Sequence, residues 1–218
     1  MRRASGALVA LLQHSDPEHW SAQAGELDWT IAEVLAHLAD VCGFYAVHLA
    51  VRSPRRLRFD VTLHASANPA DQVTTVAALA EHLARTIAAA PLDARAWHHD
   101  GMADTAGFAA MATDELLVHA ADIAEPLGIA FQPEPDICRR VLARLFPWAP
   151  SRSGAWATLL WANGRIALPG HARLGPDWAW ASAPLTEWDG ERAIRRDPPD
   201  EYEWDPAVAR WVPHGDRP

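Results

Sequence analysis

The segment "DWTIAEVLAHLADVCGFYAVHLAVRSP", residues 28–54, constrains the fold most, because it predicts one helix of about twenty residues. Thr30 and Glu33 form a T-x-x-E capping box at its start, and Pro54 marks its end. Its apolar side chains recur at helical spacing, at Ile31, Val34, Leu35, Leu38, Val41, Phe44 and Tyr45. We therefore expect this helix to bury one face inside a helical domain.

Further helices are predicted on the same grounds. They cover residues 4–13, 70–90, a stretch of about twenty residues ending near Gly128, and a shorter accessory helix within 133–147. Residues 52–69 form a long basic connection, and residues 92–107 read as a loop. Four main helices with a long crossover predict a mainly α protein built on a four-helix bundle.

The character of the chain changes after Phe146. Eight of the eleven tryptophans lie from Trp148 onward, and helical periodicity fades. Residues 157–168, "ATLLWANGRIAL", predict two short strands joined at Asn163-Gly164 in a β-hairpin. Residues 187–218 predict extended chain anchored on the bundle by tryptophans. We divide the chain into a bundle, 1–147, and a Trp-rich extension packed on it, 148–218.

Composition limits the class of protein. Half of the residues are hydrophobic and 22% are charged, which is typical of soluble globular proteins. A net charge of −9, with no lysine, argues against a nucleic-acid surface. Cys42 and Cys138 are too far apart in sequence for a CxxC pair, which favours a reducing cytoplasm. The apolar run near the N-terminus is short for a signal peptide, and no stretch has the roughly 18 apolar residues of a membrane span. We expect a cytoplasmic monomer or homodimer.

Glu115 and His119 stand out in the apolar segment "MATDELLVHAADIAEPLG", residues 111–128. Residues four apart share one helical face, with Cβ atoms about 6 Å apart, so both side chains can reach one metal ion. The same spacing also describes a hydrogen-bonded pair on a solvated edge.

His37, inside the apolar helix of residues 28–54, adds a third possible ligand. Metal sites in helical bundles are built from side chains on facing helices. Two histidines and one carboxylate give three protein ligands with open positions, which is the composition of a catalytic zinc site. A buried histidine with an ordinary hydrogen-bond partner is the alternative interpretation.

The segments "DWTIAEVLAHLAD" and "TDELLVHAADIAEPLG" resemble the two metal-ligand helices of the mycothiol-dependent maleylpyruvate isomerase family, in the DinB-like superfamily. The resemblance implies that His37, Glu115 and His119 hold one divalent ion, usually zinc. Asp122 matches an aspartate of the second motif and could orient His119, or it could bond a neighbouring arginine or the backbone. The tail from Trp156 also resembles the Trp-rich segment of many uncharacterised members.

The resemblance implies a mycothiol-dependent enzyme that acts on a small electrophilic substrate. A bound ion would activate the thiol for addition to the substrate. The enzyme would then be an S-transferase if the thiol stays attached, or an isomerase if the addition is reversed. The tail does not match the larger C-terminal domain of the isomerase proper, so the substrate stays open. Metal-dependent hydrolysis with bound water and a non-catalytic, partner-binding bundle are the alternatives.

For most of the remaining polar candidates, the sequence does not decide between a functional and a structural role. His98 and His99, before Asp100, could line the site or lie in a solvated loop. The arginines of "RSPRRLR" could attract an anionic substrate or form a solvated edge. His48 lies about 16 Å from His37 along the helix and cannot share its ion.

Overall fold

The structure is a computed structural model that describes residues 1–64 and 67–194, together with the backbone of residues 202–205 and 210–213. The helices of the bundle are α1 (Arg2–Gln13), α2 (Ile31–Val51), α3 (Pro69–Ala89) and α4 (Thr105–Ala124). Two shorter helices follow, α5 (Pro135–Leu145) and α6 (Ala155–Ala162). Single 3-10 turns occupy Pro17–Ser21 and Leu185–Glu187. The predicted mainly helical bundle is confirmed.

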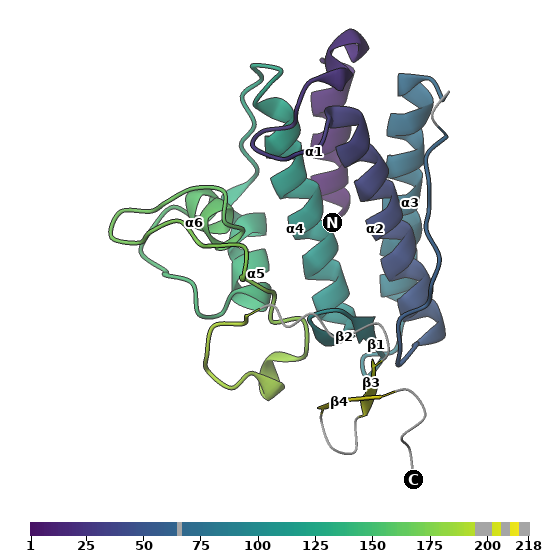
Figure 1. Ribbon diagram of the computed structural model, residues 1–218, viewed down its shortest axis with the longest axis vertical. Helices are drawn as coiled ribbons and strands as arrows, with labels where there is room; N and C mark the ends of the chain where they lie inside the picture. Colours follow the sequence, from purple (N-terminus) through teal and green to yellow (C-terminus); the bar gives the residue numbers. More distant parts are fainter. Residues whose placement is uncertain (65–66, 195–201, 206–209, 214–218) are drawn as a thin grey trace.

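The four bundle helices pack around one apolar core. α3 and α4 contact each other and both remaining helices, whereas α1 and α2 lie on opposite sides of that pair. The connection from α2 to α3 runs back along the side of the bundle, so α2 and α3 point in the same direction (Figure 1). This is the predicted long crossover. It places the start of α2 beside the end of α4, which is where the candidate ligands lie.

α2 begins as its sequence predicts. The Thr30 hydroxyl accepts a hydrogen bond from the Glu33 amide, and the Glu33 carboxylate accepts one from the Thr30 amide at 2.7 Å. Such a reciprocal cap satisfies amides that have no partner within the helix. The fixed start of α2 sets the rotation of the helix and therefore the direction of its polar side chains.

Contrary to the sequence prediction that no stretch is apolar enough for a membrane span, α2 passes that test by length and mean composition, alone among the helices in the described part of the chain. However, 61% of its most apolar window is buried inside the bundle, as in the core helix of a globular protein. Glu33, His37 and Asp40 also interrupt its apolar run.

The loop predicted at residues 92–107 instead contains a hairpin, at residues 95–104, and the first turn of α4. Strands β1 (Arg95–His98) and β2 (Gly101–Asp104) pair antiparallel, with His98 opposite Gly101. The Trp97 amide also donates to the Ser53 carbonyl at 2.7 Å, which ties the hairpin to the end of α2. Neither strand contains a β-branched residue, and Trp97 is the one strand-favouring side chain in the pair, so the strand signal in the sequence is slight.

The hairpin predicted at residues 157–168 is wrong, because its first half is helix α6. Asn163-Gly164 closes this helix in a Schellman motif: the Arg165 amide donates to Leu160 and the Gly164 amide to Trp161. Gly164 takes the required left-handed conformation, at φ 67°.

A β-hairpin does occur later in the Trp-rich segment, where β3 (Tyr202–Asp205) pairs with β4 (Arg210–Pro213). Within 148–194, Trp161 and Trp180 are buried, and Trp148, Trp156 and Trp178 are partly buried against the core, whereas Trp188 is exposed. Trp188 therefore does not provide the anchoring predicted for residues 187–218, and the side chains of residues 195–218 lie outside the described residues.

Candidate metal centre

The structure brings His37, Glu115 and His119 together, although α2 and α4 are far apart in sequence. One ligand atom from each residue lies within 4.8 Å of the other two. The Oε2 atom of Glu115 lies 3.3 Å from His37 Nε2 and 3.0 Å from His119 Nε2. The shared helical face of Glu115 and His119 and the inward direction of His37 both agree with the sequence prediction.

This geometry fits a small divalent cation. In a tetrahedral site with bonds of about 2.0–2.2 Å, neighbouring ligand atoms are about 3.3–3.6 Å apart. The two distances from Glu115 Oε2 are close to that edge length. The histidine rings meet edge to face at 80°, with centroids 5.1 Å apart, so their Nε2 atoms approach the carboxylate from different directions. Three nitrogen and oxygen donors leave positions for exogenous ligands.

Asp122 contacts His119, as it must if it has the orienting role that is one of the two predicted for it. Its Oδ2 atom lies 2.9 Å from His119 Nδ1, one turn further along α4. A carboxylate at Nδ1 keeps the proton on that atom, so the lone pair of Nε2 faces the centre. The second predicted role also holds, because Arg165 donates two hydrogen bonds to the same carboxylate.

The protonation of His119 is tied to the negative charge of Glu115. Burial alone would raise the pKa of Glu115, but hydrogen bonds and positive charge from His119 and His37 outweigh it and hold the pKa well below its usual value. Burial would lower the pKa of His119, but its hydrogen bonds to Asp122 and Glu115 raise that pKa to about 9. Without a metal ion, a proton on His119 therefore balances the Glu115 charge at neutral pH.

The centre is exposed to solvent mainly at His37. The His37 side chain is 28% exposed, whereas those of Glu115 and His119 are 13% and 9% exposed. Trp29, which is 42% exposed, lies beside His37, with the two rings 5.0 Å apart. The exposed side of the centre is therefore flanked by an indole.

Sequence reasoning gave no role to Trp29, Arg165 or Asp114. Asp114 is fully buried beside Glu115, and it accepts hydrogen bonds from Trp180 Nε1 at 2.8 Å and Asn163 Nδ2 at 3.0 Å. A buried carboxylate needs such donors. An aspartate beside the ligand in an apolar helix is the one signal that could have identified this contact.

His98, His99 and Asp100 form a second group of clustered donor atoms. His98 is buried and already engaged on both ring nitrogens: Nε2 lies 3.3 Å from the Tyr45 hydroxyl, and Nδ1 accepts from the Asp100 amide at 3.2 Å. His98 therefore has no lone pair directed at a metal ion. The solvated loop predicted here is wrong for His98, because the hairpin turns its ring into the core.

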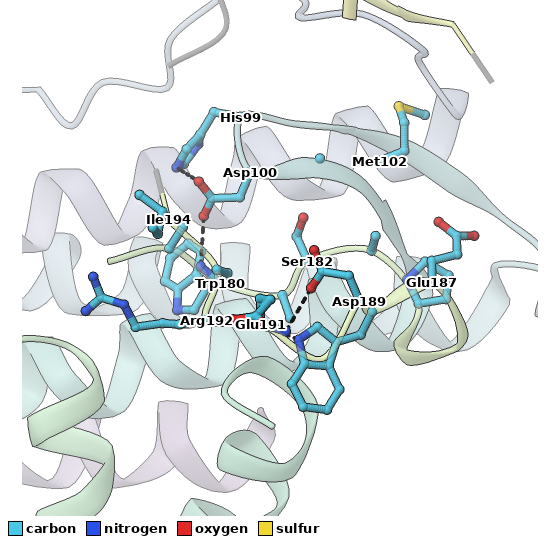
Figure 2. Close-up of a pocket in the computed structure, with 17 residues that line it drawn as sticks. His99, Asp100, Met102, Trp180, Ser182, Glu187, Asp189, Glu191, Arg192 and Ile194 are labelled. Atoms are coloured by element: carbon cyan, nitrogen blue, oxygen red, sulfur yellow. Dashed lines mark hydrogen bonds and ion pairs between the residues drawn. The ribbon is translucent and has the colours of Figure 1, made fainter. Parts of the chain in front are cut away.

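A cavity of about 660 Å³ lies beside this hairpin, at the end of the bundle where α4 begins. Figure 2 shows Asp100 between His99 and Trp180 at its wall. Glu115 lies about 15 Å along α4 from the start of that helix, and no residue of the metal centre lines the cavity.

Several candidates from the sequence lie elsewhere. Within the described residues, His48 and His64 belong to neither cluster of donor atoms. The arginines of the 52–58 run are exposed. Cys42 is buried in the core, and burial raises the pKa of its thiol to about 12. Cys138 is also free and buried. Any thiol chemistry must therefore use a thiol from solution.

Comparison with known proteins identifies the family of the chain. The family described as the mycothiol maleylpyruvate isomerase N-terminal domain matches residues 1–124 of the 218-residue chain. No curated protein and no solved structure matches the chain. The matched region contains His37, Glu115, His119 and Asp122, whereas Arg165 lies beyond it. The match spans more than half of the chain and confirms the resemblance seen in the sequence and its DinB-like fold class. The chain belongs to the mycothiol maleylpyruvate isomerase N-terminal domain family.

Proposed function

We propose that this protein is a metal-dependent, mycothiol-dependent enzyme that adds the thiol to a small electrophilic substrate or isomerises that substrate. The observation that carries the proposal is the open group of His37, Glu115 and His119 at the end of the bundle. Family membership supports the link to mycothiol. The ion is proposed to be zinc, because a site of two histidines and one carboxylate suits it.

In the proposed mechanism, three side chains would hold the ion through His37 Nε2, Glu115 Oε2 and His119 Nε2. A divalent ion bound there supplies positive charge that lowers the pKa of a coordinated thiol or water. Asp122 would keep the proton of His119 on Nδ1, so that Nε2 remains a donor. Trp29 would shield one side of the centre from water and offer an apolar face to the substrate.

Metal analysis tests the site directly. Purified protein should contain about one equivalent of a divalent metal. The variants His37→Ala and His119→Ala should lose it, because each removes one of three ligands. His82→Ala, which changes an exposed histidine on α3, is the matched control and should keep the metal. Full metal content in both ligand variants would exclude this site.

A second experiment separates thiol chemistry from the alternatives. Calorimetric titration of the zinc-loaded protein with mycothiol should show binding that is lost in His119→Ala. Turnover of an electrophile without added thiol would instead favour hydrolysis by bound water. Protein that is purified without metal, and whose melting temperature is indifferent to chelator, would favour a non-catalytic bundle.

A further inference from the structure

Arg165, in the C-terminal segment, contacts Asp122, which in turn contacts the candidate ligand His119. It follows α6 and belongs to the part of the chain that the family match does not cover. Its Nε atom donates to Asp122 Oδ1 at 2.9 Å, and its Nη2 atom donates to Asp122 Oδ2 at 2.8 Å. This two-pronged contact fixes the plane of a carboxylate more firmly than a single bond can.

The contact continues to the metal centre through one shared atom. Asp122 Oδ2, which accepts from Arg165, also lies 2.9 Å from His119 Nδ1. The side chains of Asp122 and His119 are only 7% and 9% exposed, so water cannot easily replace either partner. A rotation of the carboxylate would therefore turn the imidazole or break its hydrogen bond.

The backbone around Arg165 holds the guanidinium in place. The Arg165 amide closes the Schellman motif of α6 by donating to Leu160 at 2.8 Å. The Nη1 atom also donates to the Asn163 carbonyl at 3.1 Å. The side chain thus starts from a fixed helix end and has a bond on each of its three nitrogens.

We propose that Arg165 is a positioning residue of the metal centre, which acts through Asp122 to orient His119 and so strengthens metal binding. The inference rests on the proposed function, because it requires that His119 bind a metal ion. Outer partners of metal-bound histidines commonly change affinity by about tenfold to a hundredfold. Here the hydrogen-bonded series of outer residues would run from Asp122 in the bundle to Arg165 in the C-terminal segment.

The test compares zinc affinities by competition with a chromophoric chelator. Arg165→Gln, which cannot hold both carboxylate oxygens, should bind Zn²⁺ about tenfold to a hundredfold more weakly than the unchanged protein. Arg165→Lys keeps the positive charge but cannot donate to both carboxylate oxygens at once, so we expect an intermediate loss of zinc affinity. Arg173→Gln is the matched control: it lies in the same segment, contacts Gly164 and Glu26, and should leave affinity unchanged.

A double-variant comparison shows whether Arg165 acts through Asp122. In an Asp122→Asn background, Arg165→Gln should cause no further loss of affinity, because the connecting carboxylate is already gone. If the fold-losses of zinc affinity in the two single variants multiply in the double variant, the two residues act independently and the proposal is wrong. The visible absorption of the Co²⁺-loaded protein adds a readout of coordination geometry. It should change in Arg165→Gln and stay unchanged in Arg173→Gln.

The remaining outcomes are also distinguishable. If the unchanged protein binds no metal, the proposed function fails, and this inference fails with it. If the unchanged protein and Arg165→Gln bind zinc equally well, the inference alone fails. Should Arg165→Gln not fold, which melting in chelator would reveal, Arg165→Lys decides the question by the same affinity measurement.

Discussion

At the scale of single residues, His48 shows how burial controls a histidine away from the metal centre. It is fully buried on α2. Its Nδ1 atom lies 2.9 Å from the Phe44 carbonyl, and its Nε2 atom accepts from the Leu57 amide at 2.9 Å. Burial lowers the pKa of His48; the bond to Phe44 opposes this, and the charge of Arg56 adds to it. The neutral ring, with its proton on Nδ1, satisfies both backbone partners.

This lowered pKa predicts a loss of stability in mild acid. Below the usual histidine pKa of 6.5, the unfolded chain binds a proton that folded His48 does not, so the free energy of unfolding falls as pH decreases. His48→Gln, whose amide oxygen can still accept from Leu57, should reduce this dependence. Urea unfolding with chelator at pH about 7.5 and about 5.5 measures it. Equal pH dependence in both proteins would contradict the assignment.

The three metal-ligand candidates were predictable from the sequence, whereas their supporting residues were not. The one-turn spacing of Glu115 and His119 fixes a shared face in any helix, whatever the rest of the fold. By contrast, Arg165 lies 43 residues from Asp122, and Trp180 lies 66 residues from Asp114. These contacts depend on how a segment without periodicity folds, and no local pattern encodes that path.

At the scale of elements, α6 shows why the bundle was easier to predict than the tail. The bundle helices are long and show clear helical periodicity, whereas "AWATLLWA" is apolar on every side. A short apolar run of this kind does not distinguish a strand from a buried helix. The following Asn-Gly pair fits two structures, because a left-handed glycine closes a helix as readily as it forms a hairpin turn.

Gly164 offers a test of this helix end. In Gly164→Ala, the left-handed backbone and a Cβ atom 3.3 Å from the Leu174 carbonyl should lower the free energy of unfolding by about 1–2 kcal/mol. Gly6→Ala is the matched control, because Gly6 is exposed within α1 with no atom near its added Cβ. That change should stabilise by about 0.5–1 kcal/mol. Thermal unfolding measures both, and equal effects would argue against the Schellman closure.

At the scale of the whole molecule, the division at residue 147 stays a prediction. Across that boundary, buried carboxylates of α4 receive hydrogen bonds from the later segment: Asp114 from Asn163 and Trp180, and Asp122 from Arg165. Leu159 and Trp161 belong to the same apolar core as the bundle helices. We therefore expect the two parts to unfold together.

Truncation after residue 147 should accordingly remove cooperative unfolding. Each buried polar group that loses its partner costs about 1–3 kcal/mol, within a total stability of about 5–15 kcal/mol. Trp180→Phe is the milder variant: it keeps an aromatic ring but removes the donor to Asp114, and it should cost about 1–3 kcal/mol. Circular dichroism on heating measures both. A sharp transition at unchanged temperature in the truncated chain would show that the bundle is independent.

If the bond between Arg165 and Asp122 strengthens metal binding, a bound metal ion must in turn strengthen that bond. Coupling between two binding equilibria is reciprocal, so if docking of the C-terminal segment raises affinity for a cation, the cation must tighten docking by the same factor. A loop that follows a short helix would then respond to metal supply, although it touches no metal ligand. Metal availability would in this way determine how firmly the end of α6 and the residues around Arg165 are held on α4.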